Sequence, residues 1–535
     1  MCLVSVASSS PVPRVLLLLL LAHALVHAGL GAVLGLSGDE AHYALYAAHP
    51  ALSYYDHPPL VGWVQWPLVA LGAPDGVLRL LPETLWLITA LFIYAITRRL
   101  QRTGTSIQGT AAGASADAGL WAVLAYSLAP VLHVLGIGLL PDTLLMCLTA
   151  ALLWQTLRLF DAAQVQRLSA WLLLGLLLGL AGLAKYTAIF AALPVAACLI
   201  GVHGWAVLRR PAPWLALCLA VLVVSPVFIW NAQYGWISFA YQLHHGAGSH
   251  WQGQALLTFL LAQLLLYPLL LWGVLGLRTR VAGTAALTRS QWGLLAFFAL
   301  PFAVLAYLSG GGSSLPHWTA PAWVALAPLA GLGLARWWAA GRRRLIWLLG
   351  GLQACFTLAL YVLMLSAGPS WLQAAAPGSA EAEDLNPFTD FYGWDAAGAR
   401  AQQWARERQV TRLAVQNWTL ASRLAWYARP LPVHVIAPGF DQFSLWSGEL
   451  PVGADAVLLA LGGASWARLG SDGAWVPWLA QAGVPVGNCG IVTSGADSFQ
   501  FEVTAYDPQQ HLLSWSLVAL WGDNRSKLVA EDSYA

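Results

Sequence analysis

Charged residues are scarce in this chain. Only 9% of its 535 residues are Asp, Glu, Lys or Arg, whereas 59% are hydrophobic, a balance well outside that of soluble globular proteins. Repeated apolar runs are long enough to cross a lipid bilayer. The composition therefore excludes an ordinary soluble enzyme. It predicts a polytopic α-helical membrane protein that contacts membrane lipids and has no nucleic-acid partner.

Paired cysteines are also missing. The six cysteines, at positions 2, 147, 198, 218, 355 and 489, show no paired spacing, and most of them fall inside apolar runs. This spacing fits neither a disulfide framework nor a zinc site. We interpret the cysteines as small buried hydrophobic residues.

The apolar runs predict about eleven membrane-spanning helices of the lengths that a bilayer requires. Their approximate ranges are 14–36, 77–97, 118–137, 140–160, 168–184, 186–207, 212–230, 254–277, 291–309, 318–338 and 345–366. The first run is longer than the core of a signal peptide, so we interpret it as an uncleaved helix.

Positive charge is distributed unevenly among the loops between these helices. If the N-terminus lies in the cytoplasm, the inner loops contain nearly all of the arginines before residue 366, and the outer loops contain only Arg79 and Lys185. This asymmetry satisfies the positive-inside rule. It predicts a multi-pass protein with a cytoplasmic N-terminus and a long outer loop over residues 37–76.

The composition changes after residue 366, where acidic residues and short β-rich runs become frequent. The β-rich runs are Leu413–Gln416, Val433–Ile436, Ala456–Leu461 and Phe499–Ala505, and a helix-like segment spans Trp418–Tyr427. We therefore expect a transmembrane domain over residues 1–366. A small α/β domain over residues 367–535 would follow on the outer face.

The densest group of reactive side chains lies in the first outer loop, which reads SGDEAHYALYAAHPALSYYDHPPLVGW from Ser37 to Trp63. Ser37 and Glu40 fit a capping box, so the acidic residues could simply start a helix. That interpretation leaves Asp39 unexplained. An aspartate at the mouth of the bundle could instead act as a general base toward an acceptor hydroxyl.

Several residues in the outer loops could bind a metal ion or an anion. Asp56 and His57 precede a double proline that holds them on an extended segment, as a metal-ligand fragment, a phosphate-binding pair or an ordinary surface turn. His244, His245 and His317 lie in other outer loops. These histidines could be polar tips at the membrane boundary or could join Asp56 around a divalent metal cation.

Two more charged residues interrupt apolar sequence near the outer side. Asp142 follows a proline at a helix start, where an acid is routine, but it could also face the same cavity as Asp39. Lys185 is one of only two lysines in the chain. An ionisable group costs ~2.5–3.5 kcal/mol at the bilayer centre. Lys185 should therefore pair or bind an anion, unless it snorkels from a tight outer turn.

Together, five motifs resemble the membrane glycosyltransferases of the GT-C superfamily, in particular the ArnT-like and protein O-mannosyltransferase-like branch (glycosyltransferase family 39). They are GDEAHYALYAAHPALSYYDHPPLVGW, LPDTLL, GLAGLAKYTAIFAALP, PHWTAPAW and NPFTDFYGW, in this order from residue 37 to about 394. The resemblance implies transfer of a sugar from a polyprenyl-phosphate donor at the outer face of the bacterial inner membrane, with a periplasmic C-terminal domain. The acceptor would be lipid A, core oligosaccharide, another glycan or lipid, or a protein.

The resemblance also implies roles for individual residues. Asp39 and Glu40 form the acidic pair where the family has its catalytic base, and Asp142 and Lys185 match an acidic and a lysine position of the family. We therefore expect Asp39, Glu40 and Asp142 to be catalytic. His57 falls where aminoarabinose transferases have a lysine, so the phosphate contact of that position would pass to a histidine whose charge depends on pH.

Two further positions match the family pattern. Asp56 stands where the aminoarabinose transferases have a glutamate, and His317 matches the His-Trp of an outer loop. In-line attack by the acceptor would invert the anomeric centre of the sugar.

Three functions are compatible with these features: an inverting sugar transferase, a transporter or flippase of lipid-linked sugars, and an inactive relative that acts as a binding module. Transporters tend to place charges near the bilayer midplane and to contain internal repeats. Here the acidic residues gather at one surface and no repeat is visible. The sequence therefore favours the transferase.

Overall fold

The computed structural model describes most of the chain up to residue 449 and separate segments beyond it. The described residues are 13–108, 117–247, 250–279, 287–312, 315–366, 387–407, 409–415, 417–435, 440–449, 455–459, 468–469, 474–475, 489–494, 498–506 and 512–520.

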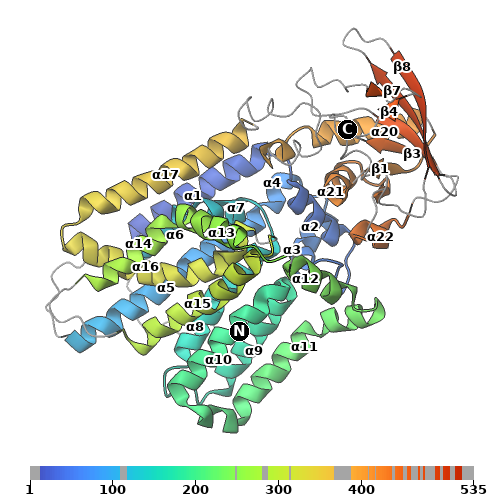
Figure 1. The fold of residues 1–535 in the computed structure, drawn as a ribbon. Coiled ribbons are helices and arrows are strands. Elements are labelled where there is room, and N and C mark those ends of the chain that lie inside the picture. The colour runs from blue at the N-terminus through green and yellow to red at the C-terminus, as the bar shows by residue number, and fades with distance from the viewer. Residues whose placement is uncertain are drawn as a thin grey trace.

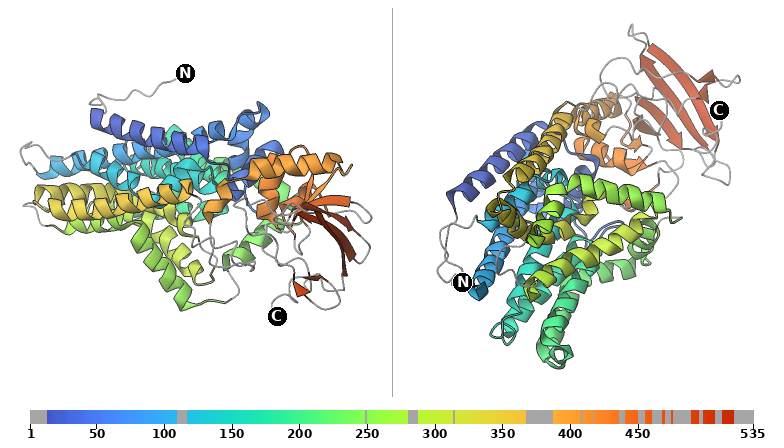
Figure 2. Two further views of the ribbon diagram at one scale, coloured as in Figure 1. Left: turned by 90° about the horizontal axis from the view of Figure 1, so that it is seen from above. Right: turned by 60° about the vertical axis from the view of Figure 1, so that its left-hand side comes forward.

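Long helices pack side by side in the first 366 residues and form an elongated bundle (Figures 1 and 2). They are α1 (Arg14–Val33), α5 (Leu80–Gln108), α8 (Pro141–Arg158), α9 (Leu168–Ala184), α10 (Ile189–His203), α11 (Pro211–Gln233), α15 (Arg289–Ser309), α16 (Ala320–Ala339) and α17 (Arg343–Leu365).

Two of the predicted spans are bent helix pairs. Helix α6 (Ala118–Ser127) meets α7 (Pro130–Ile137) at 75°, and α13 (Gly253–Leu266) meets α14 (Pro268–Leu275) with η3 (Gly276–Arg278) at 80°. In each pair the second helix begins with proline, which cannot continue the hydrogen bonding of the preceding helix. The bend at α7 turns the chain toward the corner that leads into α8.

The prediction of a polytopic helical membrane protein is confirmed, but the number of spans differs. Among the described residues, seven helices are long and apolar enough to cross a membrane, or nine if each bent pair counts as one span. The remaining predicted ranges contain α8, which is less apolar because it includes Asp142, Gln155 and Arg158, and α9, which has 17 residues. Composition alone therefore does not establish the expected eleven.

Short helices cover one end of the bundle. They are α2 (Gly38–Ala48), α3 (Leu60–Ala70), α4 (Asp75–Leu78), α12 (Ile237–Ala247) and the 3-10 helices η1 (Tyr186–Ala188) and η4 (Pro316–Thr319). Helices α2 and α3 pack closely, because a Cβ on Gly62 would come within 2.7 Å of the Tyr46 Cβ. Two other 3-10 helices are η2 (Trp205–Arg209) and η5 (Pro387–Phe391).

The C-terminal elements lie beyond the same end of the bundle (Figures 1 and 2). The helices are α20 (Trp394–Glu407), α21 (Trp418–Tyr427) and α22 (Gln442–Trp446). The strands are β1 (Leu413–Val415), β2 (Val433–Val435), β3 (Asp455–Leu459), β4 (Arg468–Leu469), β5 (Ala474–Trp475), β6 (Cys489–Ser494), β7 (Ser498–Tyr506) and β8 (Leu512–Leu520).

Six of these strands form one mixed sheet in the order β2-β1-β3-β6-β7-β8. Strand β1 pairs in parallel with β2 and β3, and the pairs from β3 to β8 are antiparallel. The predicted helix Trp418–Tyr427 coincides with α21. Two of the predicted β-rich runs contain β1 and β2, the third overlaps β3, and the fourth lies within β7. Their predicted last residues Gln416, Ile436 and 460–461 lie outside the described residues.

The bundle and the C-terminal elements have separate apolar cores that meet at α2. Trp86, Tyr126 and Trp323 are fully buried in the bundle core. Leu45 on α2 packs with Leu424 of α21 in the second core. Helix α2 therefore contributes side chains to both cores.

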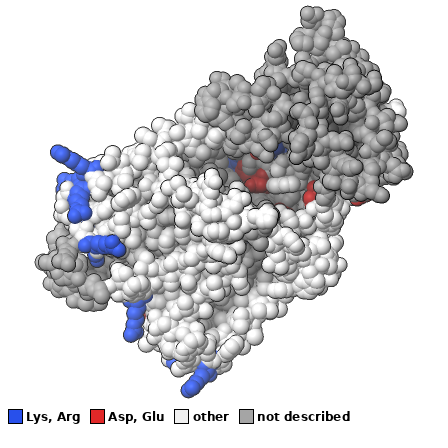
Figure 3. Space-filling view, in the orientation of Figure 1, with Lys and Arg blue, Asp and Glu red and all other residues white. Residues whose placement is uncertain are grey.

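Charged side chains separate to two ends of the surface in Figure 3. Arginine side chains project from the end of the bundle away from the C-terminal elements, whereas acidic side chains, with basic ones beside them, lie in a hollow next to the C-terminal elements. The hollow is on the side of the short helices, where the sequence predicts the reactive residues.

Candidate active site

Helix α2 begins with the predicted capping box. Ser37 Oγ accepts a hydrogen bond from the Glu40 backbone N–H at 3.3 Å, and the Glu40 carboxylate accepts one from the Ser37 N–H at 3.0 Å. The start of the helix is thereby fixed. Side chains three, four and seven positions after Asp39 consequently share its face of α2.

The Glu40 carboxylate is fully engaged in a buried ion pair. Arg79 donates from Nε to Glu40 Oε1 at 2.7 Å and from its second terminal nitrogen to Oε2 at 2.9 Å. Arg79 also donates to the backbone carbonyls of Leu34 at 2.6 Å and Gly35 at 2.7 Å. These contacts tie α2 to the end of α1. They favour a structural role for Glu40 over the predicted catalytic one.

Asp39, next to Glu40, is in a different environment. It is half-buried, and within the described part of the chain its carboxylate forms neither a hydrogen bond nor an ion pair. Burial raises the pKa of Asp39 above its usual value, and His317, His42 and His57 limit that rise. The side chain therefore combines access, raised basicity and surrounding histidines, which are the properties of a general base.

Asp56 lies at the centre of a hydrogen-bonded group on the facing loop. Tyr46 donates its hydroxyl hydrogen to Asp56 Oδ1, His42 Nε2 lies 3.4 Å from the same oxygen, and His57 Nδ1 lies 3.4 Å from Oδ2. Burial alone would raise the pKa of Asp56, but His42 and His57 hold its pKa well below the usual value. The lowered pKa favours the ionised form of Asp56, which accepts from His42 and lies beside His57, whose Nδ1 has no hydrogen-bond partner among the described residues.

A second charged group joins three separate elements. Lys185, between α9 and η1, donates to the Asp142 carboxylate oxygens at 2.8 and 2.7 Å, and His317 Nε2 of η4 lies 3.6 Å from Asp142 Oδ2. Asp142 is 2% exposed and Lys185 is 6% exposed. The Lys185 amine also lies 5.0 Å from the centre of the Trp318 ring. Lys185 thus has the charged partner that its place among apolar residues predicts, and this partner is Asp142.

The two charged groups and Asp39 lie around Tyr43 of α2. Burial raises the pKa of Tyr43 well above its usual value, and Asp39, Asp56 and Asp142 raise it further. The Tyr43 ring also lies 5.4 Å from that of His57, measured between ring centres. Three carboxylates from α2, the loop before α3 and the start of α8 therefore act on one phenol, so they face a common region.

Residues outside the first outer loop hold this region in place. His42 Nδ1 lies 3.0 Å from Ser422 Oγ of α21, and the Tyr55 backbone N–H donates to the Gln442 side chain of α22 at 2.8 Å. Gln242 of α12 donates to the Asp56 backbone carbonyl at 2.5 Å. Elements from far along the chain thus orient the residues around Asp56.

Of the histidines predicted as metal ligands, the two whose side chains the structure describes do not gather around Asp56. His244 is exposed, and its Nδ1 donates to the Ala240 carbonyl of its own helix at 2.7 Å. The side chain of His245 lies outside the described residues, and His317 contacts Asp142. Among the described residues, the one group whose ligand atoms lie close enough for a metal ion is elsewhere, at His23, His27 and His133. The predicted divalent cation at Asp56 stays a prediction.

Sequence reasoning missed three residues that shape this site. His42 and Tyr46 bind Asp56 from the Asp39 face of α2, and Trp318 covers the Lys185 amine. The helical spacing of His42 and Tyr46 from Asp39 was a usable signal. Trp318 follows His317 directly, but nothing in the sequence pairs it with Lys185.

Comparisons with known proteins bear on the family and the fold of the chain. Residues 56–230 match the family model described as dolichyl-phosphate-mannose-protein mannosyltransferase. The lipid A galacturonosyltransferase RgtD of Rhizobium johnstonii is 26% identical over 198 residues. That match covers 37% of this chain and only 38% of the relative's length.

Two solved structures match a larger share of the chain. The crystal structure of ArnT from Cupriavidus metallidurans in the apo state has a TM-score of 0.55 at 17% identity, covering 83% of this chain and 92% of that one. The structure of the same enzyme bound to undecaprenyl phosphate has a TM-score of 0.57 at 16% identity, covering 84% and 94%. At this level of identity, these matches show that the chain shares the fold of that enzyme.

Proposed function

Because the chain has the GT-C fold of ArnT, we propose that it is a glycosyltransferase that moves a sugar from a polyprenyl-phosphate donor to an acceptor hydroxyl. The observation that carries the proposal is the contrast between two neighbouring acids at the start of α2. Glu40 forms an ion pair with Arg79, whereas Asp39 forms no ion pair among the described residues and lies near Asp56, His57 and His317. A relative that acts on lipid A and a similar structure that holds undecaprenyl phosphate support the substrate classes.

Asp39 acts as the general base. An acceptor hydroxyl has a pKa far above neutral, so it needs a positioned base to become a nucleophile as it attacks the anomeric carbon. Asp39 takes the proton, the new glycosidic bond forms, and the bond from the anomeric carbon to the phosphate oxygen breaks. A single in-line displacement of this kind inverts the anomeric centre.

The leaving phosphate gains negative charge and needs cationic groups near it. Lys185 and His57 supply them, with His317 close by. Asp142 holds the Lys185 amine in position through two short hydrogen bonds. The donor phosphate would approach the amine from a side that neither the Asp142 carboxylate nor the Trp318 ring occupies.

A narrow apolar hollow beside Trp318 would contact the lipid part of the donor. It is lined by the following residues of α8, η1, α10, α15, η4 and α16: Leu145, Thr149, Thr187, Phe190, Ala191, Phe297, Pro301, Leu305, Trp318, Pro321 and Ala322. Hydrocarbon in this hollow is stabilised by about 25 cal/mol per Å² of apolar surface removed from water.

The metal ion predicted at Asp56 is not needed for this scheme. Asp56 is already bonded by Tyr46 and flanked by His42 and His57, so the described residues do not leave a set of free ligands there. We derive no step through a metal ion.

The site lies on the outer side of the bacterial inner membrane in this proposal. The arginine-rich end of the bundle faces the cytoplasm according to the positive-inside rule, and the hollow with the acidic residues faces the periplasm (Figure 3). The lipid-linked donor and the acceptor glycan, lipid or protein would meet there, under the C-terminal elements.

The test uses the purified full-length protein with a panel of radiolabelled polyprenyl-phosphate sugars, and with lipid A and membrane extracts as acceptors. We expect transfer from at least one donor, with loss of transfer in Asp39→Asn. Movement of the intact donor across liposome membranes without transfer would instead support a flippase. Donor binding without transfer or movement would support a binding module.

A further inference from the structure

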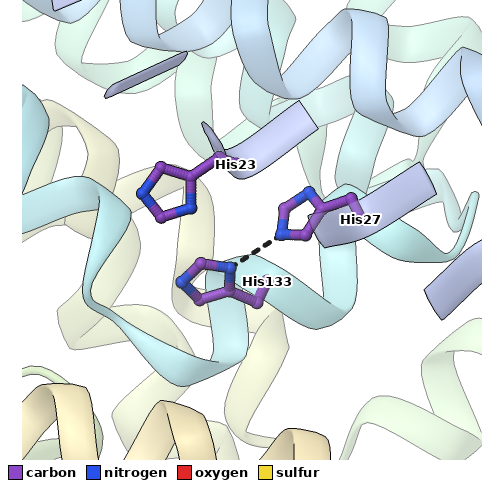
Figure 4. Close-up of side chains that lie close together, drawn as sticks. All are labelled: His23, His27 and His133. Carbon is purple, nitrogen blue, oxygen red and sulfur yellow. Dashed lines mark hydrogen bonds between the residues drawn. The ribbon is translucent and has the colours of Figure 1, made fainter. Parts of the chain in front are cut away.

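Three histidines come together inside the bundle, away from the candidate active site. His23 and His27 lie one helical turn apart on α1, and His133 lies on α7; all three rings turn toward one another (Figure 4). One ligand nitrogen from each ring lies within 4.8 Å of the others. His27 and His133 are 2% and 1% exposed, and His23 is half-buried.

The outer hydrogen bonds of two rings fix which nitrogens carry hydrogen. His133 Nε2 donates to the Ser127 backbone carbonyl at 2.7 Å, and His27 Nδ1 donates to the Glu83 carboxylate at 2.5 Å. The remaining nitrogens form a hydrogen bond of 2.8 Å in which His27 Nε2 donates to His133 Nδ1, and a bound metal ion would take the place of that hydrogen (Figure 4). Tyr361 also donates its hydroxyl hydrogen to His133 Nδ1 at 2.6 Å.

These outer bonds are the ones that metal-binding histidines use. A ligating histidine almost always donates its second ring N–H to a carboxylate or a backbone carbonyl, which fixes the tautomer and strengthens the ligand. The Glu83 carboxylate accepts this hydrogen bond from His27, and the Ser127 backbone carbonyl accepts it from His133. One oxygen of the buried Glu83 carboxylate has no hydrogen-bond partner among the described residues. A buried anion in a membrane helix needs a positive charge close by.

A glycine in α7 allows the backbone to pass close to the His27 ring. A Cβ on Gly136 would lie 2.8 Å from His27 Cε1 and 2.9 Å from Trp86 Cδ1, so glycine is required where α7 passes the two rings. Trp86 itself is fully buried and lies 5.2 Å from the His23 ring, measured between ring centres. The rings are therefore held in place from both sides.

We propose that His23, His27 and His133 form a binding site for a divalent transition-metal ion of the Zn²⁺ class. Three imidazoles with one further position suit Zn²⁺ or a similar metal. Zn–N bonds of about 2.0–2.1 Å at a tetrahedral angle separate two ligand nitrogens by about 3.4 Å. The rings of His27 and His133 would part by roughly half an ångström to admit the ion. The positive ion also balances the charge of Glu83 through His27.

The site would brace the outer end of the bundle. Helix α1 leads directly into the segment that carries Asp39, and α7 leads directly into the corner that carries Asp142. A metal ion shared by α1 and α7 thus fixes the relative position of the two chain segments that enter the candidate active site. Its role is structural, at a distance from the sugar.

The experiment measures zinc bound by the full-length protein, purified through an affinity tag without histidines. The protein is incubated with excess Zn²⁺, desalted and analysed by mass spectrometry of the metal. We expect His23→Ala and His133→Ala each to bind one equivalent less than the wild type. Four-coordinate visible absorption bands should appear with Co²⁺ in the wild type and disappear in both variants.

Two further variants sharpen the result. His203→Ala changes a half-buried histidine that donates to the Leu159 carbonyl on another part of the bundle, and it should keep the full equivalent. Glu83→Gln should weaken Zn²⁺ binding by about 10–100-fold, because it removes the carboxylate that orients His27. His23 makes ring contacts but no hydrogen bond among the described residues, so His23→Ala leaves the other cluster contacts intact. Equal zinc content in wild type, His23→Ala and His133→Ala, or no bound zinc in the wild type, overturns the proposal and leaves a purely hydrogen-bonded cluster.

Discussion

The two sides of helix α2 differ in how fully their charges are satisfied. On one side, Glu40 and Arg79 form a buried pair with two short hydrogen bonds, and backbone carbonyls take the other hydrogens of Arg79. On the other side, Asp39 is half-buried with a raised pKa and has histidines around it. Adjacent acids in the sequence thus have separate environments: Glu40 fastens the helix, and Asp39 is the residue that we propose takes part in proton transfer.

The largest expected effect is on catalysis at Asp39. Asp39→Asn keeps the size of the side chain and removes its basicity, so the rate of sugar transfer should fall by about 10²–10⁴-fold. The melting temperature should not fall, because burial disfavours the charge that the variant removes. The measurement is transfer of labelled sugar at saturating donor together with thermal unfolding of the same sample.

The opposite outcome is expected at Glu40. Glu40→Gln leaves the Arg79 guanidinium buried without its counter-charge, which typically costs about 3–5 kcal/mol. The yield of folded protein and the melting temperature should drop sharply. A Glu40→Gln protein with wild-type stability would show that the ion pair does not fasten α2.

A smaller effect, on the KM for the lipid-linked donor, is expected at Lys185. Lys185→Ala alone leaves Asp142 buried and unpaired, so it destabilises the protein as well as removing the cation. The double variant Lys185→Met with Asp142→Asn removes both charges. Its stability should approach that of the wild type, whereas the KM for the lipid-linked donor should rise by about 10–100-fold through loss of a charge-assisted contact. An unchanged KM would exclude Lys185 from donor binding.

The smallest effect is a pH dependence that belongs to Asp39. Its pKa is raised in the folded protein, so the ionised carboxylate destabilises the fold at neutral pH, and this penalty disappears as the pH falls through the raised pKa. The melting temperature of Asp39→Asn minus that of the wild type should therefore shrink on acidification. Over the same pH range kcat/KM should fall in the wild type, because the base becomes protonated. A stability difference that is constant with pH would contradict the raised pKa.

Much of the fold follows from local sequence patterns. The apolar runs locate the helices, Ser37 and Glu40 predict the start of α2, and Trp418–Tyr427 predicts α21 to the residue. Lys185 was expected to need a partner because a lone ammonium among apolar residues is costly. These features depend on neighbours in the chain or on the cost of burying charge.

Partners that lie far apart in the sequence were not predictable in the same way. Glu40 meets Arg79 across 39 positions, and His27 meets His133 across 106. The bend between α6 and α7, which brings His133 toward α1, arises at Pro130 inside a run that otherwise resembles one continuous helix. The i, i+4 spacing of His23 and His27 was the one local sign of the cluster.

The most direct test of the central claim is chemical rescue of Asp39→Ala by formate. The small variant leaves room for a soluble carboxylate beside the acceptor hydroxyl, and this carboxylate can take the proton in place of the side chain. We expect transfer by Asp39→Ala to rise with formate concentration, while the wild type and a correctly folded Asp56→Asn control show no such rise. An Asp39→Ala protein that transfers sugar at the wild-type rate without formate would contradict the assignment of Asp39 as the base.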